Sequence, residues 1–315
     1  MKRFPAIWAA PAILFTVWSC QEIIELDMEV DVDVEVDVDV ESNINIRFGG
    51  VVNPVLVEST LNYEEIMPLT SYFSNGAQGG DCWGDYFFQF TDSHRYIRIF
   101  DLSRKKMVYT ITIPDSQRGF VSNCHCNTVC FGTEYYDAED PFPLIYVSTG
   151  YASQDGYTGA LVYRITQDQD QFSIALVQTI KIKIPSWTEF IPAGDYAYLC
   201  YTGKRIIYKV KMPRLKEGDI VIDPASAVDT YQFSQQPFSS RNQDRLFYQG
   251  KIVFATGVPG GHELSALVFL NLEERERERI YNFTESGLEK ESESIFVWRD
   301  ELCVAFVDRI VKLIL

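Results

Sequence analysis

The sequence predicts an all-β chain built from one repeated sheet, on three observations. Of the 315 residues, 46% are apolar and 14% aromatic, enough to fill a sizeable globular core. Val, Ile, Tyr and Phe occur in short alternating runs between Gly, Asp, Asn and Pro clusters, which is the pattern of β-strands. No segment of about 12 residues or more has the 3.6-residue period of an amphipathic helix.

One apolar strand type recurs along the chain, and its spacing defines the repeat. Successive copies begin 58, 52, 56 and 50 residues apart. The copies are DYFFQFT (85–91), PLIYVST (143–149), DYAYLCYT (195–202), KIVFATG (251–257) and ELCVAFV (301–307).

Each copy has neighbours that complete a small antiparallel sheet. The inner strands expected before the copies are AQGGDCWG (77–84), HCNTVCFG (125–132), TEFIPAG (188–194), DRLFYQG (244–250) and ESIFVWR (293–299). The strands expected after them are YIRIFDL (96–102), ALVYRIT (160–166), RIIYKVK (205–211), ALVFLNL (266–272) and RIVKLIL (309–315). Four units have a further outer strand, MVYTITI (107–113), ALVQTIKI (175–182), DTYQFS (229–234) and RIYNFT (279–284).

Five units of four antiparallel strands at this period predict a five-bladed β-propeller. The fifth unit ends at Leu315 after three strands, so we expect VNPVLVEST (52–60) to supply its outer strand and close the ring. A six-bladed ring and an array of two-sheet sandwiches are the alternatives.

The first 19 residues predict an export signal. Lys2 and Arg3 precede an uncharged apolar run, residues 6–19, that is short for a membrane span. The run ends in Val17-Trp18-Ser19-Cys20, which resembles a bacterial lipobox and implies lipidation of Cys20. An ordinary cleaved signal peptide is the alternative. No other segment reaches about 18 consecutive apolar residues, so we expect the lipid to be the only membrane attachment.

An acidic tether is expected at residues 20–44, before a single propeller domain at 45–315. Residues 22–41 contain ten Asp or Glu and no basic residue. Their Asp-Val alternation has the period of a strand, but carboxylates gathered on one face repel one another, so a solvated linker is favoured. Metal binding by these carboxylates would be weak, because no rigid cage is evident.

These features together resemble uncharacterised propeller lipoproteins of the Bacteroidetes group. The resemblance is carried by the lipobox, the acidic stretch after it, and strings such as HCNTVCFG, PFPLIYVSTG and ALVYRIT. The acidic stretch also resembles the surface-export signal of lipoproteins in that group. The resemblance implies a propeller and a location in the cell envelope, as an outer-membrane lipoprotein that is either exposed at the cell surface or faces the periplasm, and it supplies no catalytic residues.

The charge of the chain argues against a nucleic-acid partner. The net charge is −16, and residues 42–315 still carry 34 acidic against 26 basic residues. Phosphate binding needs basic patches, which this composition does not offer.

We expect no metal and no cofactor. The six cysteines after Cys20 read as small core residues, since the chain has no CxxC pair. Cys124, Cys126 and Cys130 would share one face of a strand, and a zinc site made by them with a distant histidine is the alternative. No GxSxG elbow, Walker loop or GxGxxG is present.

The carboxylates of the inner strands are the remaining candidates for chemistry. Paired Asp or Glu residues hydrolyse glycosides when one is a protonated acid and the other is ionised. The candidates are Asp81, Glu189, Asp244 and Glu293.

The natural site of a propeller is the mouth of its central channel, where the starts of the inner strands converge. We expect a glycan or an envelope protein to bind there without catalysis, with Trp83 and Trp187 as stacking platforms or as packing against neighbouring blades. A glycoside-processing enzyme with paired carboxylates is the alternative. The candidate ligand-binding residues are Gln78, Asp81, Trp83, His125, Asn127, Trp187, Glu189, Arg241, Asp244 and Glu293.

Overall fold

The structure is a computed structural model, and its chain divides into two units, Met1–Pro54 and Val55–Leu315. It describes residues 34–39, 43–48, 56–58, 60–69, 76–120, 124–150, 155–215, 218–234, 237–238, 242–257 and 264–315, the first three ranges and Ser93 by their backbone alone. The expected signal, Cys20 and Arg241 lie outside these residues.

In the first unit, two strands form an antiparallel hairpin. β1 (Val34–Asp39) pairs with β2 (Asn43–Phe48), in a register that places Val34 opposite Phe48. The expected acidic tether therefore contains one paired strand. Its boundary with the propeller remains a prediction.

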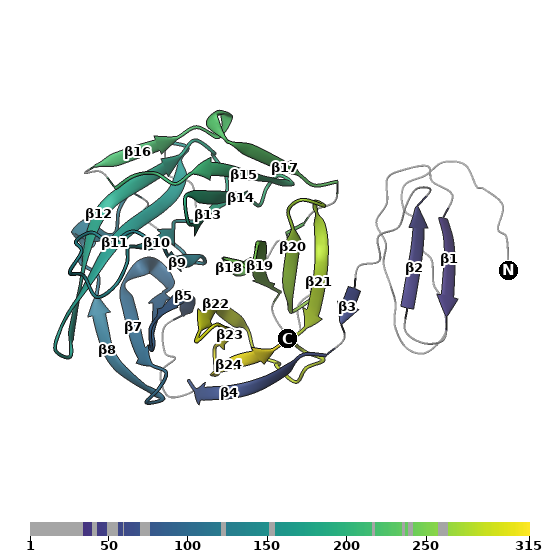
Figure 1. Cartoon of the computed structure of the whole chain (residues 1–315), viewed down its shortest axis with the longest axis horizontal. Helices are drawn as coiled ribbons and strands as arrows, with labels where there is room; N and C mark the ends of the chain where they lie inside the picture. Colours follow the sequence, from purple (N-terminus) through teal and green to yellow (C-terminus); the bar gives the residue numbers. More distant parts are fainter. Residues whose placement is uncertain are drawn as a thin grey trace. The chain divides into compact units, whose positions relative to one another are not determined.

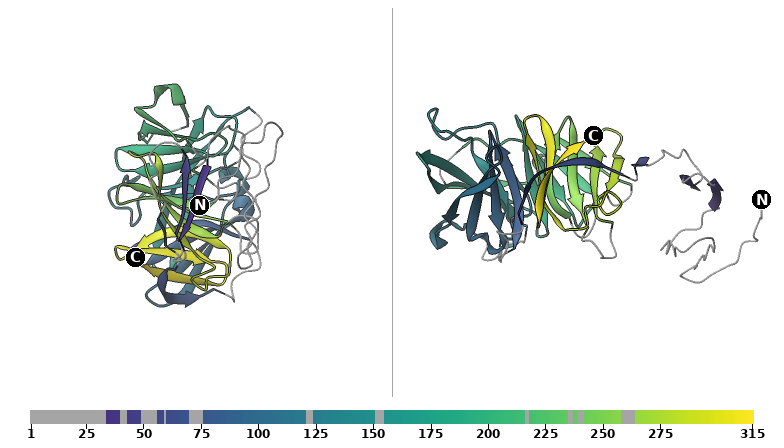
Figure 2. Two further views of the ribbon diagram at one scale, coloured as in Figure 1. Left: turned by 90° about the vertical axis from the view of Figure 1, so that its right-hand side faces the viewer. Right: turned by 90° about the horizontal axis from the view of Figure 1, so that it is seen from below.

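The second unit is a five-bladed β-propeller, as expected, counted over the described part of the chain. Figure 1 shows the sheets around a common centre with β5, β9, β13, β18 and β22 innermost, and Figure 2 shows the same blades from two sides. Blade 1 consists of β5 (Ala77–Trp83), β6 (Tyr86–Thr91), β7 (Tyr96–Asp101) and β8 (Lys106–Thr112). Blade 2 consists of β9 (Val129–Phe131), β10 (Ile145–Ser148), β11 (Thr158–Asp168) and β12 (Gln171–Ile182).

The remaining blades follow the same order from the centre outward. Blade 3 consists of β13 (Thr188–Ala193), β14 (Tyr196–Tyr201), β15 (Ile206–Lys211) and β17 (Asp229–Gln232). Blade 4 consists of β18 (Asn242–Tyr248), β19 (Lys251–Thr256), β20 (Ala266–Asn271) and β21 (Glu276–Asn282). Blade 5 consists of β22 (Ser292–Trp298), β23 (Glu301–Phe306), β24 (Arg309–Ile314) and β4 (Asn62–Pro68). Three short 3-10 turns lie between strands: η1 (Asp92–His94), η2 (Asp115–Gln117) and η3 (Pro224–Ser226).

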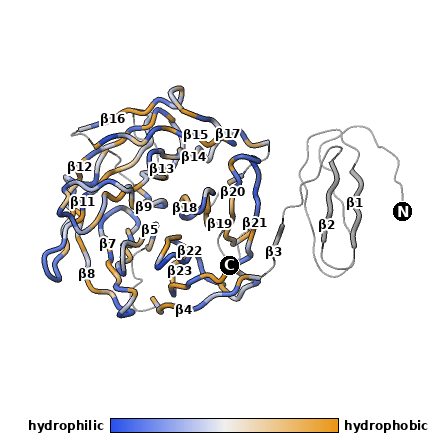
Figure 3. Tube along the Cα trace, viewed as in Figure 1, coloured by the Kyte–Doolittle hydropathy of each residue, from blue (hydrophilic) through white to orange (hydrophobic). Residues whose placement is uncertain are grey.

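The recurrent apolar segments are confirmed as the second strand of each blade, β6, β10, β14, β19 and β23. Their central residues are buried without alternation, as in β6, where Phe87, Phe88 and Phe90 are fully buried. A strand in this position has a neighbouring blade against each face, so both sets of side chains must be apolar. Figure 3 shows hydrophobic and hydrophilic stretches succeeding one another along the blades.

The ring is closed by an N-terminal strand, but the expected segment was wrong. β4 (Asn62–Pro68) pairs antiparallel with β24 and completes blade 5. The segment predicted for this role, 52–60, contains β3 (Leu56–Glu58), which instead pairs parallel with β21 of blade 4. The more polar β4 fits the outer edge because Glu64 and Glu65 pair with basic residues of β24, at 2.8 Å from Lys312 and 3.3 Å from Arg309.

Two details of blade 2 also differ from the expectation. Its inner strand is only Val129–Phe131, shorter than the predicted 125–132, because Cys126 adopts a left-handed φ of 54° that interrupts the extended chain. The blade gains a fifth strand, β16 (Asp219–Ile222), which returns from blade 3 to pair parallel with β12.

Candidate functional site

Polar contacts join neighbouring blades at all five boundaries, four of them between inner strands and one between β10 of blade 2 and the inner strand of blade 3. The Asp81 carboxylate accepts from the Phe131 amide (2.7 Å), and the Asp244 carboxylate accepts from the Ile295 amide (3.0 Å). The Ser148 hydroxyl bonds both backbone groups of Phe190, accepting from its amide at 2.9 Å and donating to its carbonyl at 3.3 Å. The other two contacts are Ser294 Oγ to the Gln78 carbonyl (2.9 Å) and the ion pair of Glu189 with Arg245.

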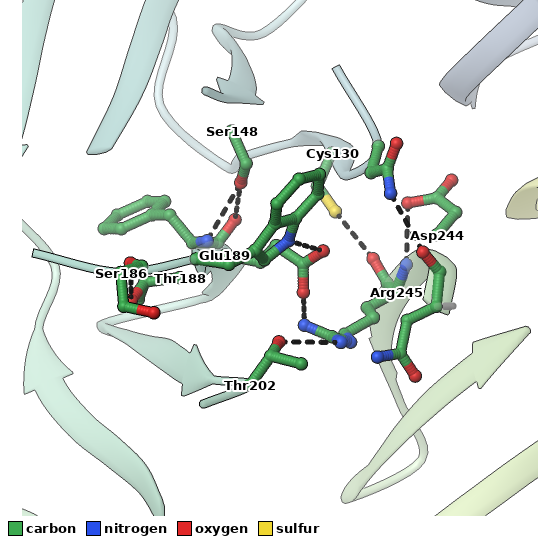
Figure 4. Close-up of polar contacts among 12 residues, drawn as sticks. Cys130, Ser148, Ser186, Thr188, Glu189, Thr202, Asp244 and Arg245 are labelled. Atoms are coloured by element: carbon green, nitrogen blue, oxygen red, sulfur yellow. Dashed lines mark hydrogen bonds and ion pairs between the residues drawn. The ribbon is translucent and has the colours of Figure 1, made fainter. Parts of the chain in front are cut away.

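The Glu189–Arg245 pair lies between blades 3 and 4, as Figure 4 shows, and both side chains are fully buried. The Trp187 indole donates to the same carboxylate (2.9 Å), and the guanidinium donates to Thr202 Oγ1 (3.3 Å). The guanidinium carbon lies 4.6 Å from the centre of the Phe238 ring. Burial lowers the pKa of Arg245 to about 9, which leaves it charged at neutral pH. Glu189 is therefore committed to a structural ion pair.

Side chains also cross the channel between blades 2 and 4. Asn127 Nδ2 donates to the Asn242 carbonyl (2.9 Å), and Cys130 Sγ donates to the Arg245 carbonyl (3.3 Å). These contacts fill the middle of the channel. They separate an N-terminal mouth, where the inner strands begin, from a C-terminal mouth, where they end.

The N-terminal mouth carries a polar group of side chains. His125 Nδ1 lies 3.0 Å from Asp92 Oδ1, and its ring meets the Trp187 ring edge-on at 5.9 Å. The Glu293 carboxyl is buried, and its Oε2 has no hydrogen-bond partner among the described residues. Burial, reinforced by the nearby Glu291 charge, raises the pKa of Glu293 well above its usual value.

The C-terminal mouth opens into a cavity of about 590 Å³. Trp83 is 37% exposed at its rim, with its ring 5.9 Å from Phe131 and 6.3 Å from Tyr135. Residues from the ends of all five inner strands and the turns after them line it: Asp81, Cys82, Trp83, Gly84, Asp85, Cys130, Phe131, Pro192, Leu246, Phe247, Val297, Arg299 and Asp300.

Two-residue turns shape this mouth. The hairpins after β5, β13, β18 and β22 turn at 84–85, 194–195, 249–250 and 299–300. At 249–250 and 299–300 both turn residues have positive φ, as a type I′ turn requires. At 84–85 and 194–195 only the first residue, Gly84 or Gly194, has positive φ, as in a type II′ turn. Such turns hold Asp85, Arg299 and Asp300 around the opening. Asp85 accepts hydrogen bonds from the Trp298 indole (2.9 Å) and from Arg299 (3.1 Å).

Sequence reasoning placed its candidates at one mouth, and the structure divides them. Asp81 and Trp83 line the cavity at the C-terminal mouth. Asn127, Glu189 and Asp244 are buried in the filled middle, with Gln78 joined to blade 5 through its carbonyl. His125, Trp187 and Glu293 lie at the N-terminal mouth. A ligand-binding role for these residues remains a prediction.

Several cavity residues escaped the sequence analysis. Asp85, Phe131, Phe247, Arg299 and Asp300 line the cavity but were not among the candidates. The available signal was the turn dipeptide that follows each inner strand, such as Gly84-Asp85 or Arg299-Asp300.

Three of the four candidate acids are held by the fold, Glu189 by its ion pair and the two aspartates by backbone amides. Each oxygen of Asp81 accepts a backbone amide, from Cys82 and from Phe131, both at 2.7 Å. Asp244 does the same with Arg245 (2.7 Å) and Ile295 (3.0 Å). Burial raises the pKa of Asp81 to about 7 and that of Asp244 well above its usual value. The carboxylates of Asp81 and Asp244 therefore link neighbouring inner strands through backbone amides.

No protein-family model matches the chain, and no curated protein matches it. Among solved structures, a glutaminyl cyclase from Myxococcus xanthus has a TM-score of 0.49 at 9% identity, covering 82% of this chain and 96% of that one. A PQQ-bound aldose sugar dehydrogenase from Streptomyces coelicolor has a TM-score of 0.45 at 10% identity, covering 81% and 97%. A Bacteroides caccae protein of unknown function has a TM-score of 0.36 at 10% identity, covering 73% and 70%.

At these identities and TM-scores the likenesses carry no argument about activity. The class of the protein rests on its own sheet topology, which is that of a five-bladed β-propeller. Within the residues that the structure describes, no helix is long and apolar enough to cross a membrane.

Proposed function

We propose that the chain is a lipoprotein of the bacterial cell envelope whose propeller binds a glycan in the cavity of the C-terminal mouth, without catalysis. The observation that carries this proposal is the cavity itself, about 590 Å³ in volume and formed by all five inner strands. This volume is in the usual range for small-molecule pockets, whereas a stable protein interface buries roughly 800 Å² on each partner.

The lining of the cavity suits a sugar. The exposed Trp83 ring offers a flat apolar surface to the carbon face of a pyranose. The carboxylates of Asp85 and Asp300 accept hydrogen bonds from hydroxyl groups, and Arg299 donates them. A ring platform with polar groups around it favours a glycan over a purely apolar ligand.

A glycan array probed with the full chain, followed by calorimetric titration of the best ligand, tests this proposal. Trp83→Ala is expected to weaken binding at least about tenfold, because it removes the platform. Tyr96→Ala is the matched control, since Tyr96 is equally exposed (36%) but does not line the cavity. Binding of no glycan, or equal affinity of the Trp83→Ala variant, would overturn the proposal.

The anchor is proposed from the sequence Val17-Trp18-Ser19-Cys20. Cells fed a labelled fatty acid are expected to label the chain, and Cys20→Ala is expected to abolish the label and release the protein from the membrane fraction. Two or more acyl chains would make the attachment stable, since a single chain binds only marginally. Labelling that survives Cys20→Ala would exclude this anchor.

A glycoside-processing enzyme is the second candidate, and one observation favours it. Asp81 lines the cavity, and its pKa of about 7 suits a general acid. Against this role, both of its oxygens already accept backbone amides. Turnover of a bound glycan that is lost in Asp81→Asn, with binding retained, would establish the enzyme and refute the non-catalytic proposal.

A further inference from the structure

Three metal-ligating side chains converge between blades 1 and 2, away from the cavity. His94 lies in η1, the turn between β6 and β7, while Cys124 and Cys126 precede β9. One ligand atom from each lies within 4.8 Å of the other two, and the two sulfur atoms are 3.4 Å apart. A tetrahedral zinc ion with ordinary bond lengths would hold such atoms roughly 3.5–3.8 Å apart, so only small side-chain shifts separate this arrangement from a coordination sphere.

The imidazole of His94 is almost completely buried. The side chain is 1% exposed, and a backbone group of Arg118 lies near the ring, but no hydrogen bond of standard geometry to either ring nitrogen is found among the described residues. A buried polar group that is poorly hydrogen-bonded destabilises the folded state, so the ring has bonding capacity left for a ligand.

The two cysteines are equally enclosed, at 2% and 0% exposure for Cys124 and Cys126. Cys124 Sγ lies 3.6 Å from the Ser148 carbonyl, its nearest polar neighbour besides Cys126. A thiolate buried in this place needs a cation beside it. The three ligand side chains bring no positive charge of their own, and a tetrahedral ion would need one further donor.

The backbone holds the group in position. Cys126 has a φ of 54°, and its carbonyl accepts the Gly79 amide of β5 at 2.9 Å. A Cβ added at Gly79 would lie 2.5 Å from that carbonyl oxygen, so the segment is seated as closely on blade 1 as the backbone permits. The bend at Cys126 brings the two thiols together, whereas the expected continuous strand through Cys124, Cys126 and Cys130 would not. Cys130 instead points to the Arg245 carbonyl.

We propose that His94, Cys124 and Cys126 bind one zinc ion that fastens the β6–β7 turn of blade 1 to the segment leading into blade 2. Two thiolates and a neutral imidazole balance the charge of a divalent cation, as burial requires, whereas a monovalent copper ion would leave a net negative charge. A fourth oxygen ligand completes the usual tetrahedron. Because His125 lies between the two cysteines, the ion would also hold that side chain against Asp92 at the N-terminal mouth.

Metal content and cobalt substitution of the full chain test the proposal. Protein refolded under reducing conditions with Co²⁺ alone is expected to bind one equivalent and to show sulfur-to-cobalt charge-transfer absorption, which Zn²⁺ then displaces. Cys124→Ser and His94→Asn are expected to weaken binding at least about a hundredfold, since each removes a ligand. Asn is chosen at position 94 because it tolerates the left-handed φ of 51° found there.

Cys130→Ser is the matched control, because it removes a buried thiol of the same segment that lies outside the cluster. It is expected to keep the full equivalent of metal. Unchanged binding in Cys124→Ser, or binding of Cu⁺ but not of Zn²⁺, would overturn the assignment. The mass of the unmodified full chain gives a readout independent of variant folding: a Cys124–Cys126 disulfide in protein purified without reductant, with no bound zinc, would also refute it.

Discussion

Two charged side chains near the propeller axis, Glu189 and Arg245, are buried away from solvent. Glu189 and Arg245 are both fully buried and contact each other, so each charge can be buried only because the opposite charge lies beside it. Removing one partner of a buried ion pair leaves an uncompensated charge, whereas replacing both with apolar residues of similar volume is often neutral. The same pair that prevents Glu189 from acting as a free acid thus joins blades 3 and 4.

Glu189→Gln is expected to lower the free energy of unfolding by about 3–5 kcal/mol, measured by urea denaturation, because it leaves the buried Arg245 guanidinium without a counter-charge. The double variant Glu189→Leu/Arg245→Met is expected to recover most of that loss. Lys183→Gln, which breaks an exposed ion pair with Asp223 (3.2 Å), is the control and should change stability little. A double variant as unstable as the single one would contradict this account.

The Asp81 carboxyl makes stability depend on pH. Its pKa rises from 3.8 to about 7 on folding, chiefly through burial, so the folded state retains a proton that the unfolded chain releases. The stability that this group contributes is fully present below about pH 4 and is lost as the pH rises through 7. One such group gives a slope of up to about 1.4 kcal/mol per pH unit.

Urea denaturation between pH 4 and 8 should therefore show a steeper fall for the wild-type chain than for Asp81→Asn. Glu293 shifts in the same direction and is present in both proteins, so it cancels in the comparison. Part of the Asp244 shift comes from the Asp81 charge, so the difference between the two profiles reports Asp81 together with its repulsion of Asp244. Parallel pH profiles of the two proteins would show that Asp81 is ionised in the folded state.

At the scale of elements, strand β4 decides whether the ring is closed. It is the outer strand of blade 5 and comes from the opposite end of the second unit from the three strands it completes. Ile66 and Met67 are its buried residues, at 5% and 1% exposure, and they belong to the core shared by blades 5 and 1. Without this strand, β24 would present an unpaired edge.

Met67→Ala is expected to lower the free energy of unfolding by about 2–5 kcal/mol, because it leaves a cavity under the closing strand. Urea denaturation measures the loss, and light scattering should detect association through the weakened edge. Glu64→Ala, on the exposed side of the same strand, is the control with little change. Equal stability of the two variants would mean that closure does not depend on β4.

At the scale of the whole molecule, the second unit is expected to fold by itself. All five blades and the closing strand lie within Val55–Leu315. A chain of these residues alone should unfold cooperatively at a melting temperature within about 2 °C of that of the full chain, as a domain with its own core does. Differential scanning calorimetry measures this. A broadened or much lower transition would show that residues before 55 stabilise the propeller.

Much of the fold could be predicted because its signals are local. The five second strands were found from their uninterrupted apolar residues, and the blade count followed from their spacing. The strands that were predicted wrongly or missed depend on partners far away in the sequence. β16 pairs with a strand of the preceding blade, and β4, rather than residues 52–60, pairs with β24 and closes the ring. The predicted length of the inner strand of blade 2 was wrong for a different reason. Cys126 has a left-handed backbone conformation, which interrupts a segment whose residues favour an extended chain.

The candidate site was predicted less well. The inner strands do contribute residues to the cavity, Trp83 and Asp81 among them, but the cavity lies where these strands end and not where they begin. The contacts in the middle of the channel could not be predicted from the sequence, because residues such as Asn127 and Asn242 meet only across the ring.

By itself, the sequence determined the class of secondary structure, the number of blades and the order of their strands, since hydrophobic periodicity is a property of neighbouring residues. Only the tertiary structure decided which side chains meet: Glu189 with Arg245, Asp81 with the Phe131 amide, and His94 with two cysteines of the next blade. These partners lie roughly 30 to 60 residues apart and meet only when the blades pack around the axis, so no local pattern in the chain specifies the distances between them.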